Sequence, residues 1–175
     1  WDVSNATNMH YMFANQVNFT GLDNNNNKNS DNVAGILGEW DFSRLSNWDV
    51  SSVKDISYMF HHAHVFYQDI GNWDVSAGSD FRRMFAFSSF NQDIGSWNTS
   101  NVTNMSDMFL WSVSFNQDIG SWDTANVTDM SNMFEWATSF NRDLSGWCVS
   151  NISSDPGFGG PNLQNSYKPV WGTCP

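Results

Sequence analysis

The sequence repeats itself every 25 residues, and this repeat restricts the possible folds more than any other feature. The segment FNQDIGSWNTSNVTNMSDMFLWSVS begins at Phe90, FNQDIGSWDTANVTDMSNMFEWATS begins at Phe115, and FNRDLSGWCVSNIS begins at Phe140. A related copy begins at Phe66, one residue shorter, and the chain opens with WDVSNATNMHYMFANQVNF, which is half of the same unit. Units this short cannot bury their apolar side chains alone, so successive units must stack and share one core.

Each unit combines two spacings of apolar residues. Met105, Met108 and Phe109 follow the i, i+3, i+4 spacing that predicts one short helix, with Thr103 as its N-cap. Residues 94–102 place Ile, Trp and Val among turn-forming residues, which predicts short strands broken by turns. We therefore predict an α/β repeat solenoid, similar to a leucine-rich repeat, with short strands and one short helix in each coil of about 25 residues.

Tryptophan marks the register of the repeat and divides the chain. Stacking predicts ladders of Trp, Val, Met and Phe along the core. The repeat tryptophans are Trp1, Trp48, Trp73, Trp97, Trp122 and Trp147. We assign residues 1–153 to the repeat solenoid, with a loop insertion at about 20–47, and residues 154–175 to an irregular C-terminal cap or linker. Whether residues 33–47 form a coil of their own stays open.

Charge and motif content exclude several classes of function. The chain has 18 acidic residues against 7 Lys and Arg, a formal net charge of −11, which leaves little positive charge to neutralise nucleic acid or an anionic membrane. No apolar run approaches the roughly 20 residues that span a bilayer. The sequence shows no nucleophile elbow, metalloprotease helix, phosphate loop or dinucleotide fingerprint. We therefore predict a protein that is not an enzyme and has no cofactor.

Cys148 and Cys174 are the two cysteines, and both lie near the C-terminal end. An even pair in an irregular segment rich in Pro and Gly predicts a disulfide that fastens a terminal cap. The alternative is two free thiols in a reducing compartment.

Asparagine sequons recur along the repeat. They fall at Asn5, Asn18, Asn98, Asn101, Asn104, Asn126 and Asn151. Four of them lie four residues after the repeat Trp, so stacking would align them as a ridge of N-linked glycans on a secreted protein. The alternative is that a chain rich in Asn, Ser and Thr contains sequons by chance and that duplication copied them.

A row of aspartates also recurs, one in each unit, before Ile or Leu. Its members are Asp69, Asp93, Asp118 and Asp143. We interpret them as caps of Asx turns, with a bound Ca²⁺ as the alternative, although their spacing matches no defined calcium loop.

A histidine cluster, His61, His62 and His64, has the composition of a zinc site. Two units later along the chain, however, Leu110 and Trp111 occupy the positions of the first two histidines. We therefore interpret the cluster as a variable surface position and assign no metal.

The segment FNQDIGSWDTANVTDMSNMF resembles the repeat of BspA-like leucine-rich-repeat surface proteins, found among secreted and surface-anchored microbial proteins. The resemblance covers most of residues 1–153 and is tightest from Phe66 to Trp147. It implies a leucine-rich-repeat-like solenoid exposed outside the cell, in adhesion or in a surface layer, and it implies no chemistry.

Two functions follow as hypotheses for an extracellular or cell-surface protein. Because Trp1 lies inside a repeat, the chain is expected to be a processed product or part of a longer one, with an open apolar coil at its end. Such an end favours a structural subunit that self-associates into a surface layer or filament. The alternative is an adhesin-type module that binds a glycan or a protein partner through Trp111 and Trp136, unless these two residues belong to the core.

Overall fold

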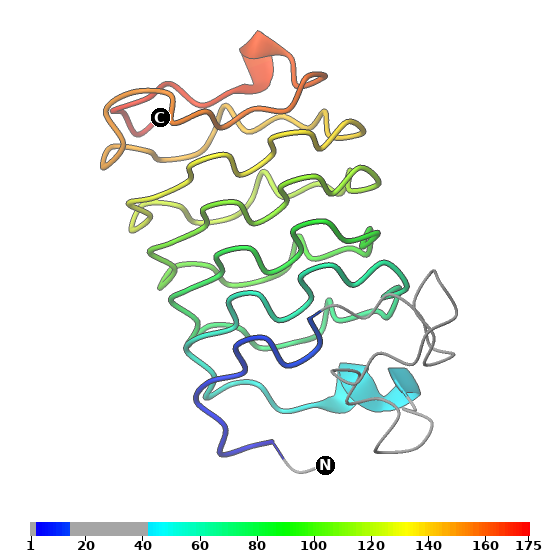
Figure 1. The fold of residues 1–175 in the computed structure, drawn as a ribbon. Coiled ribbons are helices and arrows are strands. Elements are labelled where there is room, and N and C mark those ends of the chain that lie inside the picture. Colours follow the sequence, from blue (N-terminus) through cyan, green and yellow to red (C-terminus); the bar gives the residue numbers. More distant parts are fainter. Residues whose placement is uncertain (1–2, 15–41) are drawn as a thin grey trace.

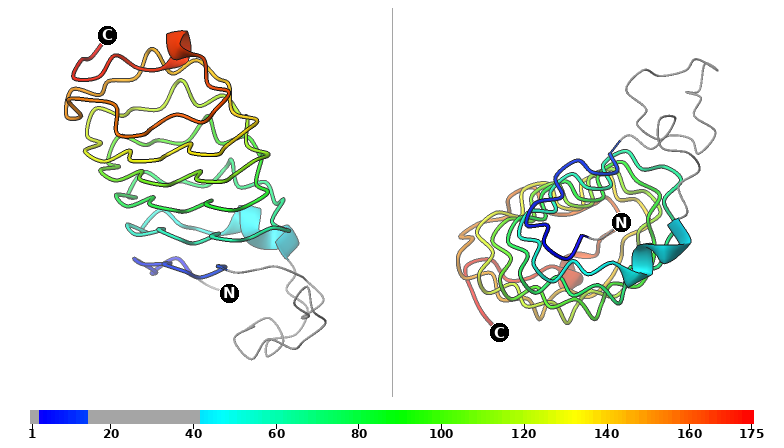
Figure 2. Two further views of the ribbon diagram at one scale, coloured as in Figure 1. Left: turned by 45° about the horizontal axis from the view of Figure 1, so that its top comes forward. Right: turned by 90° about the horizontal axis from the view of Figure 1, so that it is seen from below.

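The computed structural model describes residues 3–14 and 42–175. The chain winds through successive coils that stack along one axis, from the N-terminal residues at one end to the C-terminal segment at the other (Figure 1). Viewed along the stack, the coils superpose as a flattened ring (Figure 2). Residues 3–14 form part of one coil, and residues 48–72, 73–96, 97–121 and 122–146 form those that follow.

Turns rather than helices and strands build these coils. Within the described residues the helical elements are two 3₁₀ helices, η2 (Phe42–Asn47) and η3 (Asn165–Tyr167). No residue in these ranges belongs to an extended strand. Single parallel bridges join one coil to the next, and they link Asn8, Asp55, Asp80, Asn104 and Asp129 in that order.

Residues 105–111 show how the turns replace the predicted helix. Asp107 and Trp111 have φ values of 55° and 56°, in the left-handed region, so no continuous right-handed helix passes through them. The N–H of Phe109 donates to the carbonyl of Met133 in the next coil at 2.9 Å, and the amides of Asp107 and Trp111 donate to that coil in the same way. Between them, the amides of residues 108 and 110 close turns to carbonyls three residues earlier in their own coil.

The predicted α/β repeat solenoid, with leucine-rich-repeat-like coils of short strands plus one short helix, is therefore wrong. The physical reason is the distance between coils. Phe109 stacks on Phe85 and Phe134 at ring distances of 5.6 and 5.5 Å, whereas packed helices lie about 8–10 Å apart. A helix in every coil would not fit this spacing. Thr103, the predicted N-cap, instead donates its hydroxyl to the Ser79 carbonyl of the preceding coil at 3.1 Å.

The predicted ladders of core side chains are confirmed. Trp73, Trp97, Trp122 and Trp147 are 1–4% exposed, and the Trp97 and Trp122 rings stack at 6.4 Å. Each of these indoles donates its Nε1–H to a carbonyl of the preceding coil, at 2.8–3.1 Å. The hydrogen bonds satisfy polar atoms that burial would otherwise leave unpaired. Trp48 is only partly buried, and Trp1 lies outside the described residues.

Glycine permits the coils to approach at the Asp-Ile-Gly turns. A Cβ atom built on Gly95 would lie 2.6 Å from the carbonyl oxygen of Asp118 in the next coil, and Gly71 and Gly120 meet the equivalent oxygens at 2.5 and 2.8 Å. Any other residue would push the coils apart there. In the last repeat Ser145 occupies the position of these glycines. The glycine is therefore required only where another repeat coil follows.

Residues 154–175 close the stack at its C-terminal end. Phe158 is fully buried, and its carbonyl accepts a hydrogen bond of 3.0 Å from the N–H of Phe134 in the last repeat coil. A disulfide joins Cys148 to Cys174 across 26 residues. The segment thus covers the aromatic core at this end. The predicted insertion at about 20–47 lies outside the described residues except for η2.

Candidate functional site

A column of stacked rings runs along the outside of the coils. It consists of the second left-handed residue of each coil, and these residues are His62, Phe87, Trp111 and Trp136, with φ values of 56–59°. Successive ring centroids lie 4.5, 6.3 and 5.1 Å apart, with interplanar angles of 6°, 6° and 25°. A side chain held at positive φ costs about 1–3 kcal/mol, which the hydrogen bonds between coils offset. The fold therefore fixes these rings in one register.

The column continues into a second set of aromatic residues. Tyr58 stacks on Tyr11 at 4.5 Å, and His61 lies 5.5 Å from Tyr58 and 5.8 Å from Phe87. We call the combined surface the aromatic band, and it comprises Tyr11, Tyr58, His61, His62, Phe87, Trp111 and Trp136. Tyr11, Trp111 and Trp136 are 47%, 44% and 48% exposed. The sequence left open whether the two tryptophans are core residues, and the structure places them on the surface.

Arginine borders the aromatic band near Tyr58. The guanidinium carbons of Arg82 and Arg83 lie 5.8 and 5.6 Å from the Tyr58 ring centroid, within the range of a cation–π contact. Arg83 also pairs with Asp107 at 2.9 Å, and this hydrogen bond raises the pKa of the Arg83 guanidinium. This edge of the band therefore combines aromatic rings with fixed positive charge.

The histidine cluster contributes rings to the band. Burial, reinforced by the neighbouring His62, lowers the pKa of His61 to about 4, and burial also lowers the pKa of His62. Both rings are therefore neutral at pH 7. The rings of His62 and His64 lie 5.7 Å apart at 70°. Across residues 3–14 and 42–175, no three His, Cys, Asp or Glu side chains converge to hold a metal ion.

Three of the aligned sequon asparagines form hydrogen bonds between coils. The Nδ2 atoms of Asn101, Asn126 and Asn151 donate to backbone carbonyls of the preceding coil at 2.8, 2.7 and 2.8 Å. An N-linked glycan would attach to these same nitrogen atoms. The position therefore has a structural use that does not require a glycan.

The remaining sequons differ in their surroundings. The side-chain oxygens of Asn98 and Asn104 accept hydrogen bonds from the backbone and hydroxyl of the serine two residues later. Asn98 and Asn5 are exposed, and Asn104 is half-buried. Asn18 lies outside the described residues.

The aspartate row forms Asx turns. In each member one carboxylate oxygen accepts a hydrogen bond from the N–H two residues later, at 2.9–3.0 Å. The members are Asp69, Asp93, Asp118 and Asp143. The contact with Ser145 lowers the pKa of the Asp143 carboxyl. The turn therefore supplies a partner for each of these carboxylates without a cation.

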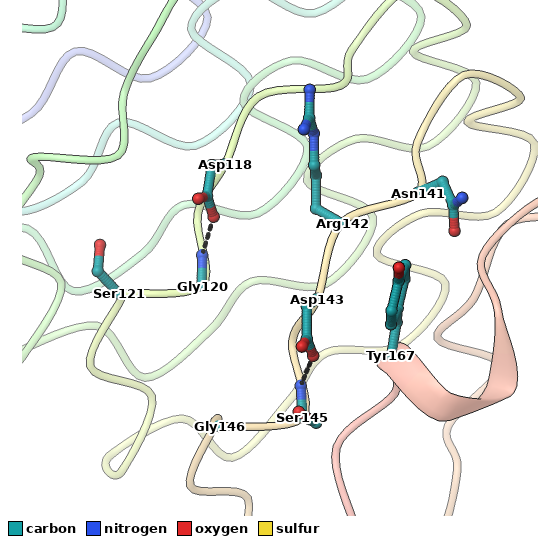
Figure 3. Close-up of a pocket in the computed structure, with 9 residues that line it drawn as sticks. All are labelled: Asp118, Gly120, Ser121, Asn141, Arg142, Asp143, Ser145, Gly146 and Tyr167. Carbon is teal, nitrogen blue, oxygen red and sulfur yellow. Dashed lines mark hydrogen bonds between the residues drawn. The ribbon is translucent and has the colours of Figure 1, made fainter.

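A polar hollow of about 610 Å³ opens beside the last two of these turns. Figure 3 shows Asp118 and Asp143, from successive coils, on the same hollow as Arg142, Asn141 and Tyr167. Tyr167 comes from η3 in the closing segment, and its carbonyl accepts a hydrogen bond from the Leu144 N–H at 2.8 Å. In the earlier coils the carbonyl oxygen of each Asp lies against the glycine of the coil before it. The closing segment does not repeat this close contact, and the hollow is the space that results.

Sequence reasoning missed the hollow and the extent of the band. Two departures from the repeat were visible signals: Arg142 replaces the Gln of the earlier units, and Ser145 replaces their Gly. Tyr167 lies outside the repeat, so the periodicity gave no indication of its position. Phe87 was visible as the counterpart of Trp111, but its exposure depends on the left-handed turn that carries it.

Comparison with known proteins identifies a family. The family model described as Mycoplasma protein of unknown function, DUF285, matches residues 1–89 and also residues 86–158. No curated protein and no solved structure gives a significant match. In the described residues, no helix has the length and apolar content needed to cross a membrane. Because the two matches together cover most of the 175 residues, the chain belongs to the family described as Mycoplasma protein of unknown function, DUF285.

Proposed function

We propose that the chain is a non-catalytic binding module, displayed outside the cell, that contacts a protein partner through the aromatic band. The exposure of Trp111 and Trp136 carries the proposal, because both rings are held in register and yet are 44% and 48% exposed. Apolar surface left in water costs about 25 cal/mol per Å², and contiguous exposed apolar patches mark interaction sites. Trp, Tyr and Arg, the residue types gathered here, also contribute most to binding energy at protein interfaces.

The stacking geometry favours a protein over a sugar at this surface. A sugar packs its C–H groups against the face of an aromatic ring. Within the column the facing rings lie 4.5–6.3 Å apart, too close for another ring to enter. Between its ends the column therefore presents ring edges, which carry partial positive charge and attract carbonyl oxygens and the faces of other aromatic rings. A protein surface supplies both.

Two further observations support display outside the cell. The disulfide between Cys148 and Cys174 is of a kind that persists in oxidising compartments. The repeat also resembles that of BspA-like surface proteins, whose members are implicated in adhesion. We propose that the chain shares the repeat sequence and the surface display of that group. The proposal does not extend to leucine-rich-repeat geometry.

Binding measurements on matched variants test the proposal. The purified chain would be tested by biolayer interferometry against fibronectin, laminin, collagen and a second copy of itself. Trp111→Ser and Trp136→Ser alter exposed side chains, and Tyr67→Ser removes an aromatic residue that is 57% exposed and outside the band. We expect each Trp variant to weaken binding by about 10- to 30-fold, as for interface hot spots, with Tyr67→Ser unchanged. Equal binding by all variants, or no binding to any of these proteins, would contradict the proposal.

Self-association through the ends of the stack stays a prediction. Residues 154–175 cover the last repeat coil, so a contact at that end would involve this segment instead of a bare coil. Sedimentation velocity distinguishes the two modes, because association through the band is lost in Trp136→Ser and association through the ends is not.

A further inference from the structure

We propose that the polar hollow beside Asp118 and Asp143 binds a neutral saccharide, at a site separate from the aromatic band. The hollow is lined by two carboxylates, a guanidinium, an amide and the Tyr167 side chain (Figure 3). This inference goes beyond the proposed protein-binding function and does not depend on it.

The free hydrogen-bonding atoms match the hydroxyls of a sugar. Asp118 accepts one hydrogen bond, through Oδ1 from the N–H of Gly120, and Asp143 accepts hydrogen bonds from the N–H and the hydroxyl of Ser145. An ionised carboxylate has about four acceptor sites, so both groups can still accept hydrogen bonds from a ligand. Arg142 donates through Nε to the Asn116 carbonyl at 2.8 Å, which leaves its two terminal nitrogens to donate. A pair of neighbouring sugar hydroxyls presents donors and acceptors that suit both groups.

Tyr167 supplies the apolar component that such a ligand requires. It is half-buried, packs partly against the core, and is held by η3 and by the hydrogen bond from the Leu144 amide to its carbonyl. A phenol ring next to charged hydrogen-bonding groups combines a surface for the C–H face of a pyranose with polar groups that fix its orientation.

Charge restricts the class of saccharide. The hollow contains two carboxylates against one guanidinium, and the chain carries a net charge of −11. This field repels sialylated, sulfated and uronic sugars. A metal-mediated contact also lacks support, because no three candidate ligands converge within the described part of the chain. The expected ligand is therefore a neutral hexose or N-acetylhexosamine at the end of a glycan.

The earlier turns do not form the same site. At Gly71, Gly95 and Gly120 the next coil lies so close that a Cβ atom would meet its backbone oxygen at 2.5–2.8 Å. In the last repeat Ser145 stands at the position of those glycines, so the closing segment leaves room there for a side chain. A Cβ atom added at the neighbouring Gly146 would meet no atom within 4 Å. The arrangement predicts a single such site in residues 42–175.

A glycan array tests the inference. The intact chain would be biotinylated and assembled on streptavidin, because four copies strengthen the retention of weak single-site ligands. The array would carry neutral, sialylated and sulfated glycans. The variants are Asp118→Asn, which retains the oxygen that caps the Asx turn, and Arg142→Gln.

We expect the wild-type chain to bind neutral glycans and to reject the anionic ones. Asp118→Asn and Arg142→Gln should reduce the signal by about tenfold or more, as expected for lost hydrogen bonds to charged groups, and Trp136→Ser and Tyr67→Ser should leave it unchanged. Circular dichroism would verify that the variants are folded. Absence of neutral-glycan binding, preference for anionic glycans, or full binding by Asp118→Asn and Arg142→Gln would overturn the inference. A loss of protein binding in Trp136→Ser with glycan binding intact separates this site from the band.

Discussion

Replacing Gly95 with alanine perturbs the stack at one defined point. The new Cβ would lie 2.6 Å from the Asp118 carbonyl oxygen, and real Cβ contacts essentially never fall under 3.0 Å, so the two atoms must separate by at least about 0.4 Å. The adjacent hydrogen bonds between these coils would lengthen with them, including that from the Trp122 indole to the Ile94 carbonyl at 3.0 Å. Overpacking of this kind costs about 1–3 kcal/mol.

Thermal unfolding followed by calorimetry measures this cost. For a chain of this size each kcal/mol lowers Tm by about 2–4 °C, so we expect Gly95→Ala to unfold about 2–12 °C below the wild type. Gly146→Ala is the control, one residue after the equivalent turn position of the last repeat, because a Cβ atom added there would meet no atom within 4 Å. Where alanine fits the native backbone, replacing glycine stabilises the folded state by about 0.4–1 kcal/mol, because it restricts the unfolded chain. The control should therefore have a slightly higher Tm than the wild type. A Gly95→Ala variant as stable as the control would refute the close stacking of these turns.

Three further predictions concern the hydrogen bonds, the disulfide and the histidines. Asn126→Ala removes a 2.7 Å hydrogen bond between coils and should cost about 1 kcal/mol in urea unfolding. Reduction of Cys148–Cys174 should lower the free energy of unfolding by about 2–4 kcal/mol, measured with and without reductant. Burial lowers the pKa of His61 to about 4 from 6.5, so the unfolded state binds more protons in this range and stability should fall as the pH decreases from about 6.5 to 4. His61→Leu should reduce this pH dependence of Tm, and an unchanged profile would exclude His61 as its source.

Much of the core could be predicted from the repeat itself. The aligned Trp97 and Trp122, and the Met and Phe residues after them, had to share an interior because no single unit can bury them. The local backbone could not be predicted in this way. Met105, Met108 and Phe109 have helical spacing, but two successive turns with left-handed residues at Asp107 and Trp111 bring the same side chains to one face. The distance between coils decides between these structures, and that distance is a property of the stack rather than of one unit.

The candidate sites were predictable only in part. Trp111 and Trp136 were recognisable as equivalent positions, yet their exposure depends on backbone geometry that spacing does not reveal. The hollow requires Tyr167 to lie above the last aspartate turns. Because Tyr167 belongs to the closing segment, no periodicity relates it to Asp118, and only the tertiary structure brings the two onto one hollow.

The most direct test of the stack is a scalar coupling across a hydrogen bond, measured by NMR on the ¹⁵N,¹³C-labelled chain. The structure predicts a coupling from the Phe109 amide nitrogen to the Met133 carbonyl carbon, because that N–H donates across the coils at 2.9 Å. An α-helix through this segment would instead couple the Phe109 amide to the Met105 carbonyl, four residues earlier. Detection of that second coupling in place of the first would contradict the stacked-turn fold and the exposed aromatic band that depends on it.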